Sequence, residues 1–176
     1  IRILLVDDHS VLRQGLKMFL GLEADLEVVG EASNGLEALD KVAELQPDVV
    51  LMDLLMPEMD GITAIREVRN RHPEVEVIAL TSVLEDASVV GAVKAGAIGY
   101  LLKNVSHQEL AAALRRAADG QSVLSPEATQ ALVESASRVT PVVEALTPRE
   151  SQVLALMVEG LTNLQIGQRL GLTEST

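Results

Sequence analysis

Short runs of apolar residues alternate along the chain with longer stretches in which apolar residues recur every three or four positions. Several short runs contain no polar residue, as expected for strands that are covered on both faces of a sheet. The predicted strands lie at residues 1–6, 27–32, 48–52, 76–80 and 98–102. The longer stretches between them predict amphipathic helices.

The helical stretches and the strands alternate regularly over residues 1–121. Leu12 and Leu16, for example, share one face of the first predicted helix. Two of the stretches begin with pairs that have the spacing of a helix cap, Asn34 with Glu37 and Ser106 with Glu109. Five strand–helix units in succession predict an α/β fold with a five-stranded, doubly wound parallel sheet. Right-handed crossovers would place helices on both faces of this sheet.

The pattern changes after residue 121. Residues 122–144 predict a linker with one short helix, because Pro126 follows a serine at a typical first helical position. Residues 145–176 predict a second, all-α unit. Its first helix would begin near Pro148 and end at Gly160, and a second helix follows after a turn. Two short helices joined by a turn indicate part of a helix-turn-helix.

Composition and charge narrow the class of protein. The chain has 176 residues and no cysteine, which excludes disulfides and thiolate metal sites. Its formal net charge of −12 argues against binding nucleic acid by bulk attraction. The apolar runs are much shorter than the roughly 18 residues that cross a bilayer, and no basic segment of a signal peptide precedes the first run. We therefore expect a soluble, cytoplasmic protein that does not contact a membrane.

Polar side chains follow four of the five predicted strands. They are Asp7 and Asp8, Asp53, Thr81 and Lys103. The carboxyl ends of parallel strands meet at one edge of the sheet, where open α/β folds bind their ligands. Three carboxylates and one ammonium leave this edge negatively charged, so a divalent cation would balance it. Carboxylates and water are the ligands that Mg²⁺ prefers, and the pattern therefore predicts a magnesium and phosphoryl site.

The residue types suggest separate roles at this site. Asp53 is the candidate nucleophile, because a carboxylate can accept a phosphoryl group as an acyl phosphate. The hydroxyl of Thr81 and the ammonium of Lys103 would bind the phosphoryl oxygens. The backbone carbonyl of Leu55 is placed to be a further metal ligand. The three histidines show no metal-ligand spacing or obvious partner and are expected at the surface; they are His9, His72 and His107.

Three classes of function fit these residues: a transcription factor switched by phosphorylation, a phosphatase or related phosphotransferase, and a binding module that works without phosphorylation. An aspartyl-phosphate enzyme typically needs an acid/base carboxylate two residues after its nucleophile, where this chain has Leu55. Leu55 and Val83 both flank the expected path of a hydrolytic water, and neither can orient it by hydrogen bonding. They predict slow to moderate loss of the phosphoryl group. The complete pocket argues against a module that needs no phosphate.

The runs LLVDDH, VLMDLLMPEMDG, ALTS and GYLLK resemble the receiver domain of two-component response regulators over about residues 1–121. The resemblance implies that Asp53 accepts a phosphoryl group from a sensor histidine kinase and that Thr81 and Lys103 hold it. It also implies a Mg²⁺ site formed by Asp7, Asp8, Asp53 and the carbonyl of Leu55. A receiver is a phosphoacceptor switch and not an enzyme that turns over an external substrate.

Tyr100 occupies the position of the switch aromatic of this family, and the resemblance implies that it turns inward as Thr81 moves toward the phosphate. Phosphorylation would thereby bias an element with two states. The expected output is homodimerisation and control of DNA binding. Two dimer faces remain open at this point: the first and fifth helices, or the face from the fourth strand to the fifth helix.

The runs LTPRE, VLALMVEGLTN and QIGQRLGLTEST resemble the LuxR-type helix-turn-helix of the NarL/FixJ class over residues 145–176. The match stops where the recognition helix should begin. We therefore expect the chain to be part of a longer protein that binds DNA, and not to bind DNA specifically by itself. Leu164 replaces a lysine that is common in the family, which removes one expected phosphate contact.

Overall fold

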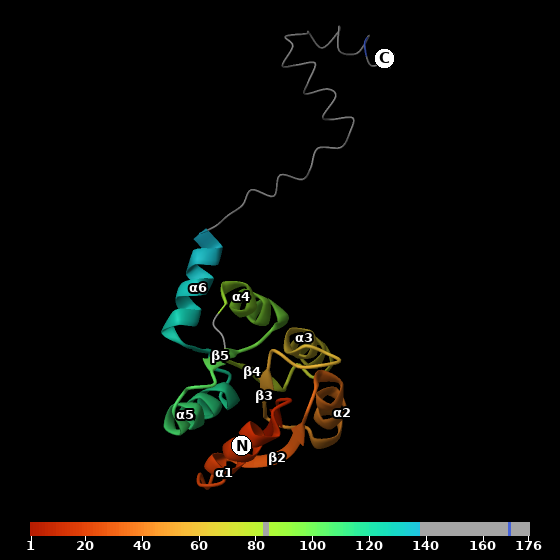
Figure 1. Ribbon diagram of the computed structural model, residues 1–176, viewed down its shortest axis with the longest axis vertical. Coiled ribbons are helices and arrows are strands. Elements are labelled where there is room, and N and C mark those ends of the chain that lie inside the picture. The colour runs from red at the N-terminus through yellow and green to blue at the C-terminus, as the bar shows by residue number, and fades with distance from the viewer. Residues whose placement is uncertain (83–84, 138–168, 170–176) are drawn as a thin grey trace. The chain divides into compact units, whose positions relative to one another are not determined.

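The computed structural model describes residues 1–82, 85–137 and 169 (Figure 1). Contacts divide the chain into two units, Ile1–Arg138 and Val139–Thr176. The predicted helix-turn-helix over residues 145–176 lies outside the described residues, apart from Arg169. Val83 also lies outside them.

The first unit is built around a six-stranded parallel sheet with the strand order β2-β1-β3-β4-β5-β6. The strands are β1 (Arg2–Val6), β2 (Glu27–Ala32), β3 (Val49–Asp53), β4 (Glu76–Thr81), β5 (Gly99–Leu102) and β6 (Val123–Leu124). The helices are α1 (Ser10–Leu20), α2 (Gly35–Leu45), α3 (Gly61–Arg71), α4 (Asp86–Ala95), α5 (His107–Ala118) and α6 (Pro126–Ser137). All five strands expected from the sequence are present, with ends that differ by one residue at most.

Helices cover both faces of the sheet, as the doubly wound prediction requires (Figure 1). Alternate residues of a strand point to opposite faces. Leu4 and Val6 of β1 belong to a buried cluster with α2, α3, α4 and α6. Ile3 and Leu5 belong to a second buried cluster with α1 and α5. The apolar runs are therefore continuous because each side of the sheet has its own core.

Two predicted helix caps are confirmed. The side chain of Asn34 accepts a hydrogen bond from the backbone N–H of Glu37 at 2.9 Å, at the start of α2. Ser106 and Glu109 form a complete capping box at the start of α5. Each cap satisfies backbone N–H groups that have no partner within the helix. The caps thus determine the residues at which α2 and α5 begin, and therefore where the preceding loops end.

The segment after residue 121 differs from the expected linker. Val123 and Leu124 form β6, which pairs with β5 and adds a sixth strand to the sheet. The following helix, α6, packs against α4 and buries Ala128 and Ala131 in the same cluster as the sheet. A strand of two residues is too short to show an alternating pattern of apolar and polar residues. This strand is stabilised by its pairing with β5. The sequence pattern therefore predicted only five strands.

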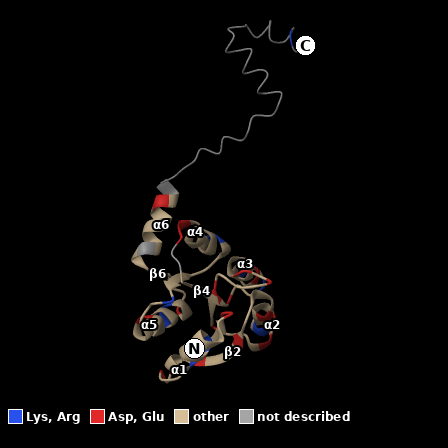
Figure 2. Cartoon of the chain, in the orientation of Figure 1, with Lys and Arg blue, Asp and Glu red and all other residues tan. Residues whose placement is uncertain are grey.

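The outer helices carry charged residues of both signs, which Figure 2 shows interspersed on α2 and α5. Ion pairs one helical turn apart are part of this pattern, such as Lys41 with Glu37 at 3.2 Å on α2 and Arg71 with Glu67 at 2.6 Å on α3. Pairs of this kind stabilise a helix by a few tenths of a kcal/mol. Within the described part of the chain, no helix is both long and apolar enough to span a membrane.

Candidate functional site

The candidate site lies where the strand order changes direction, between β1 and β3. In open α/β sheets the crevice at this point, outside the carboxyl ends of the strands, is the usual ligand site. Asp7 directly follows β1, Asp53 ends β3, Thr81 ends β4 and Lys103 directly follows β5. Asp7, Asp53 and Thr81 are the buried polar residues of the described chain, each at most 3% exposed. Buried polar side chains gathered at one edge indicate a functional site.

The ammonium of Lys103 lies between two buried carboxylates. Its Nζ is 2.7 Å from Oδ2 of Asp7 and 2.8 Å from Oδ2 of Asp53. The backbone N–H of Lys103 donates to the carbonyl of Thr81 at 2.7 Å, which holds the start of the β5–α5 loop beside β4. Burial acts to lower the pKa of Lys103, but its hydrogen bonds to Asp53 and Asp7 outweigh burial and raise that pKa. Lys103 therefore keeps its positive charge.

Asp53 is a buried carboxylate whose negative charge is only partly offset. Burial raises the pKa of Asp53, the Lys103 ammonium acts in the opposite direction, and the neighbouring charge of Asp7 raises the pKa further. The other oxygen of Asp53, Oδ1, accepts a long hydrogen bond of 3.4 Å from the backbone N–H of Leu55. An additional cation beside Asp53 would therefore favour its ionised, nucleophilic form.

A metal ion fits the acidic side chains at this edge. Ligand atoms from Asp7, Asp8, His9 and Asp53 all lie within 4.8 Å of one another. Oδ2 of Asp7 is buried and faces the Lys103 ammonium at 2.7 Å. Carboxylate oxygens with room for water are the ligands that Mg²⁺ takes. The acidic side chains at this edge therefore fit Mg²⁺.

The loop after β3 is fixed directly against the end of that strand. The N–H of Gly61 donates to the carbonyl of Leu54 at 3.0 Å. A Cβ atom on Gly61 would lie 2.0 Å from the carbonyl oxygen of Asp53, so no other residue fits there. Asp60 caps α3 by accepting the N–H of Thr63 at 2.9 Å. Because of these contacts, the position of Asp53 depends on the start of α3. Leu55, two residues after Asp53, is 67% exposed.

Tyr100 is fully buried, and a side-chain hydrogen bond joins it to Thr81. Burial raises the pKa of the Tyr100 hydroxyl, so it remains protonated at neutral pH. The sequence predicted an inward turn of Tyr100 on movement of Thr81. In the structure the ring already points inward, and the two hydroxyls are directly linked. A displacement of Thr81 would therefore reach Tyr100 through this one contact.

Sequence reasoning missed two residues that contact the site. Nδ1 of His9 lies 2.6 Å from Oδ1 of Asp8 and 3.2 Å from Oδ1 of Asp7. The guanidinium of Arg13 donates to the carbonyl of Asp7 and is 3.4 Å from Glu31. The only signal in the sequence was the position of His9 directly after Asp8. The contacts of both His9 and Arg13 depend on the path of the β1–α1 loop, which the sequence pattern does not predict.

The expectation that the histidines lack partners was wrong. The side chain of His9 is at the surface, 69% exposed, but it contacts both aspartates. Nδ1 of His72 lies 3.5 Å from Glu74. The ring of His107 stacks on Phe19 with a centroid distance of 5.6 Å. Only His9 is part of the candidate site.

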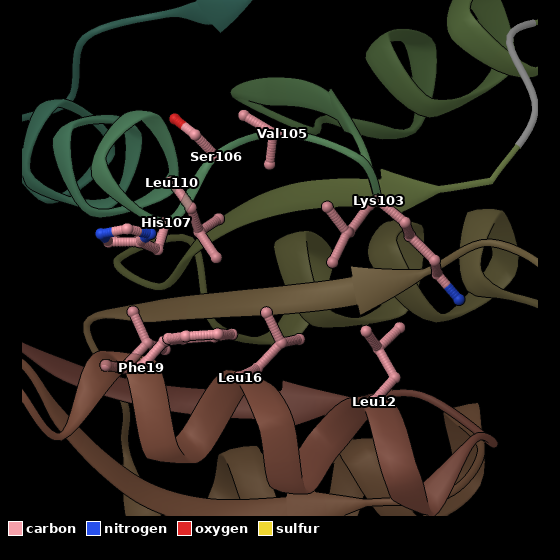
Figure 3. A pocket seen from close by; sticks show the side chains of 10 residues that line it. Leu12, Leu16, Phe19, Lys103, Val105, Ser106, His107 and Leu110 are labelled. Carbon is pink, nitrogen blue, oxygen red and sulfur yellow. The ribbon is translucent and has the colours of Figure 1, made fainter.

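An apolar cavity of about 310 Å³ lies beside the site, between α1 and the start of α5 (Figure 3). Leu12, Leu16 and Phe19 line it from α1, and Leu110 faces them from α5. The methylene stem of Lys103 lines one end of the cavity, and its ammonium points away from it. The stem of Lys103 is therefore held by apolar contacts that do not depend on the charge of its ammonium.

The chain matches two known families. Residues 3–115 match the response regulator receiver domain, and residues 144–176 match the bacterial regulatory proteins of the luxR family. The match to the receiver covers most of the described residues and includes the acidic cluster of the candidate site. The chain thus belongs to the two-component response regulators, in the class whose output is a LuxR-type DNA-binding unit.

The relatives agree with this assignment. The response regulator protein VraR of Staphylococcus aureus is 39% identical over 176 residues, which is all of this chain and 84% of VraR. The receiver domain of the putative response regulator NarL from Mycobacterium tuberculosis is 36% identical, with a TM-score of 0.67 over 69% of this chain and 98% of that one. A LuxR-family two-component response regulator from Aurantimonas sp. SI85-9A1 is 33% identical, with a TM-score of 0.72 over 78% of this chain and 98% of that one.

This protein is accordingly a response regulator that acts as a LuxR-type transcription regulator, and its receiver is not a classical enzyme.

Proposed function

We propose that Asp53 is the phosphoacceptor of this response regulator. The observation that supports this most strongly is the contact of one ammonium, that of Lys103, with the buried carboxylates of both Asp53 and Asp7. Asp53 can also share a metal ion, because its ligand atom lies within 4.8 Å of the ligand atoms of Asp7 and Asp8. We assign Mg²⁺ to Asp7, Asp8, Asp53 and the backbone carbonyl of Leu55.

The transfer forms one bond and breaks one. A carboxylate oxygen of Asp53 attacks the phosphorus of the donor, while the bond from phosphorus to the donor nitrogen or oxygen breaks and the leaving group keeps the electron pair. Bound Mg²⁺ supplies positive charge that offsets the repulsion between the carboxylates and the phosphoryl oxygens. Lys103 Nζ exchanges its contact with Asp53 for a phosphoryl oxygen, and the hydroxyl of Thr81 donates to another.

The output of this event would pass through Tyr100. Thr81 must release or reorient its hydrogen bond to Tyr100 when it turns to the phosphoryl group. Tyr100 belongs to the same buried cluster as Ala128 and Ala131 of α6. The carbonyl of Tyr100 also accepts a hydrogen bond from the N–H of Ser125, directly before α6. The effect of phosphorylation at Asp53 would thus reach α6, the helix that precedes the second unit in the chain.

We propose the remaining partners on the same basis. A sensor histidine kinase donates the phosphoryl group, and phosphorylation drives formation of a homodimer that binds DNA through the complete C-terminal domain. Residues 1–121 supply the receiver functions, residues 122–144 lead from them to the second unit, and residues 145–176 begin the DNA-binding domain. Such a regulator works in the cytoplasm, where its DNA is.

The direct test is phosphate uptake by the purified chain with a small acyl phosphate donor and Mg²⁺. Intact-mass analysis is expected to show one added phosphoryl group on the wild type and none on Asp53→Asn. Asp60→Asn is the matched control, because asparagine can still cap α3 and the residue lies in the same loop. Equal uptake by wild type and Asp53→Asn would remove Asp53 from this role.

The lifetime of the phosphoryl group provides a second prediction. Leu55 is exposed beside Asp53 and offers no hydrogen bond to a water molecule. Leu55→Asn is therefore expected to speed loss of the phosphoryl group severalfold, since an amide can orient the attacking water. The measurement is the decay of the phosphorylated mass after removal of the donor. Leu55→Met is the control, and identical decay in all three proteins would contradict this role of Leu55.

A further inference from the structure

The apolar cavity between α1 and α5 has the size of a small-molecule site (Figure 3). Its volume of about 310 Å³ lies at the lower end of the range of about 300–1,000 Å³ that is usual for such sites. Leu12, Leu16 and Phe19 line one side, and Leu110 lines the other. The buried side chain of Leu80, near the end of β4, also lines the cavity. Two helices and the sheet thus surround a space that suits one small molecule and is too small for a helix.

Polar contacts on both sides of the cavity fix the spacing of α1 and α5. Lys103, which precedes α5, contacts Asp7, which precedes α1, at 2.7 Å. Arg115 of α5 lies 2.7 Å from both Glu23 and Asp25, in the segment that follows α1. Because these contacts hold the two helices apart, the cavity is formed before a ligand binds.

The walls of the cavity offer a ligand mainly apolar contact. The ammonium of Lys103 points away from the cavity, toward the carboxylates of Asp7 and Asp53. The hydroxyl of Ser106, at the rim, is already bonded to Glu109 in the capping box of α5. Water would make few hydrogen bonds to such walls, and an apolar ligand that displaces poorly bonded water gains affinity. The walls therefore favour an uncharged ligand that is largely hydrocarbon.

The rim of the cavity adds an aromatic surface and one polar group. The rings of Phe19 and His107 are stacked with planes 13° apart, and both side chains are exposed. Stacking uses the face of the His107 ring, so the nitrogen atoms at its edge can still hydrogen-bond to a ligand. Aromatic rings pack well in offset-stacked or edge-to-face arrangements, which the Phe19 ring offers here. The rim therefore favours a flat ring with at most one polar group.

We propose that this cavity binds a small, uncharged aromatic molecule, with its ring between α1 and α5 and its polar group at the edge of His107. The bound ring contacts the methylene stem of Lys103, whose ammonium lies between the carboxylates of Asp7 and Asp53. The receiver thus has a place for a small-molecule input, on the other side of Lys103 from the acidic cluster. This site goes beyond the proposed phosphorylation of Asp53 and does not depend on it.

The test is titration of the full chain with indole, a flat ring with one polar N–H, followed by NMR of the methyl groups. Saturable shifts are expected at Leu12, Leu16 and Leu110. The Kd should be below about 1 mM, an affinity within the limit for a ligand of this size. Imidazole is the control ligand, because it is also a flat ring but is too polar for the walls. It should cause no saturable shift at these three residues.

Leu16→Phe tests the position of the ligand. It is expected to weaken indole binding by about tenfold or more, because the larger side chain takes up space inside the cavity. Met18→Phe is the matched control, since Met18 is on the same helix but is 70% exposed and does not line the cavity. Its indole affinity should differ from the wild type by less than about twofold. Circular dichroism of both variants shows whether they fold.

His107→Phe tests the polar group at the rim without changing a buried position. Phenylalanine can keep the stack on Phe19 but offers no hydrogen bond. Indole binding should therefore weaken severalfold, while binding of benzene, which has no polar group, should not. Equal loss for both ligands would contradict the assigned orientation.

Three results would overturn the proposal. The first is methyl shifts that never saturate up to the solubility limit of indole, and the second is equal affinity in wild type and Leu16→Phe. The third is shifts of the cavity methyl groups on raising the protein concentration without indole, together with dimers in analytical ultracentrifugation. A side chain of a second copy would then fill the cavity. Phosphate uptake with Mg²⁺, measured on the same proteins, reports separately on the role of Asp53.

Discussion

Lys103→Met is expected to lower the free energy of unfolding by about 3 kcal/mol in the absence of Mg²⁺, because it leaves the buried carboxylates of Asp7 and Asp53 without their shared cation. Methionine retains an apolar stem, and the cavity beside α1 already packs against that part of Lys103. The loss is therefore one of charge more than of packing. Urea unfolding with and without Mg²⁺ measures it.

Mg²⁺ should stabilise Lys103→Met more than the wild type, since the variant site has three carboxylates and no ammonium. Lys94→Met is the control, because Lys94 is an exposed lysine on α4. Unfolding curves that are the same for Lys103→Met and wild type without Mg²⁺ would show that the ammonium does not balance the buried carboxylates.

Ala131→Phe is expected to separate α6 from α4 while phosphate uptake at Asp53 continues. Ala131 is 4% exposed, in the buried cluster that also holds Tyr100. A phenyl ring does not fit this space, and overpacking of this kind costs about 1–3 kcal/mol. In the wild type, phosphorylation should change hydrogen exchange in both α4 and α6. In Ala131→Phe, α6 should exchange fast before and after phosphorylation.

Gln130→Phe serves as the control for this experiment, because Gln130 is exposed on the same helix. It should behave like the wild type in both measurements. If phosphorylation changes hydrogen exchange of α6 equally in Ala131→Phe and wild type, then α6 does not depend on its packing in the Tyr100 cluster. The intact-mass measurement on the same samples shows whether each protein was phosphorylated.

The sequence predicted the parts of the fold that depend on local pattern. The uninterrupted run over residues 49–52 identified a central strand, and the pairs at Asn34 and Ser106 identified helix starts that the structure confirms. The convergence of Asp7, Asp53 and Lys103 was predicted because parallel strands end at a common edge, and the three side chains are in contact. Periodicity and topology were sufficient for these features.

Other features depend on contacts that no local pattern encodes. Val123 and Leu124 become a strand because β5 offers them backbone partners. Ala128 and Ala131 are buried because α6 folds back on α4, and alanine is equally common on exposed helices. His9 contacts Asp8 through the turn of a loop, and the guanidinium of Arg13 reaches the carbonyl of Asp7 from the first turn of α1. Tertiary placement determined all of these.

The most direct test of the central claim is to locate the phosphoryl group after reaction with an acyl phosphate donor and Mg²⁺. Borohydride reduces an aspartyl phosphate to a stable alcohol, so the modified residue survives digestion and can be identified by peptide sequencing in a mass spectrometer. We predict the reduced residue at position 53 and nowhere else. A reduced residue at Asp7 or Asp8, or at no position at all, would contradict the account.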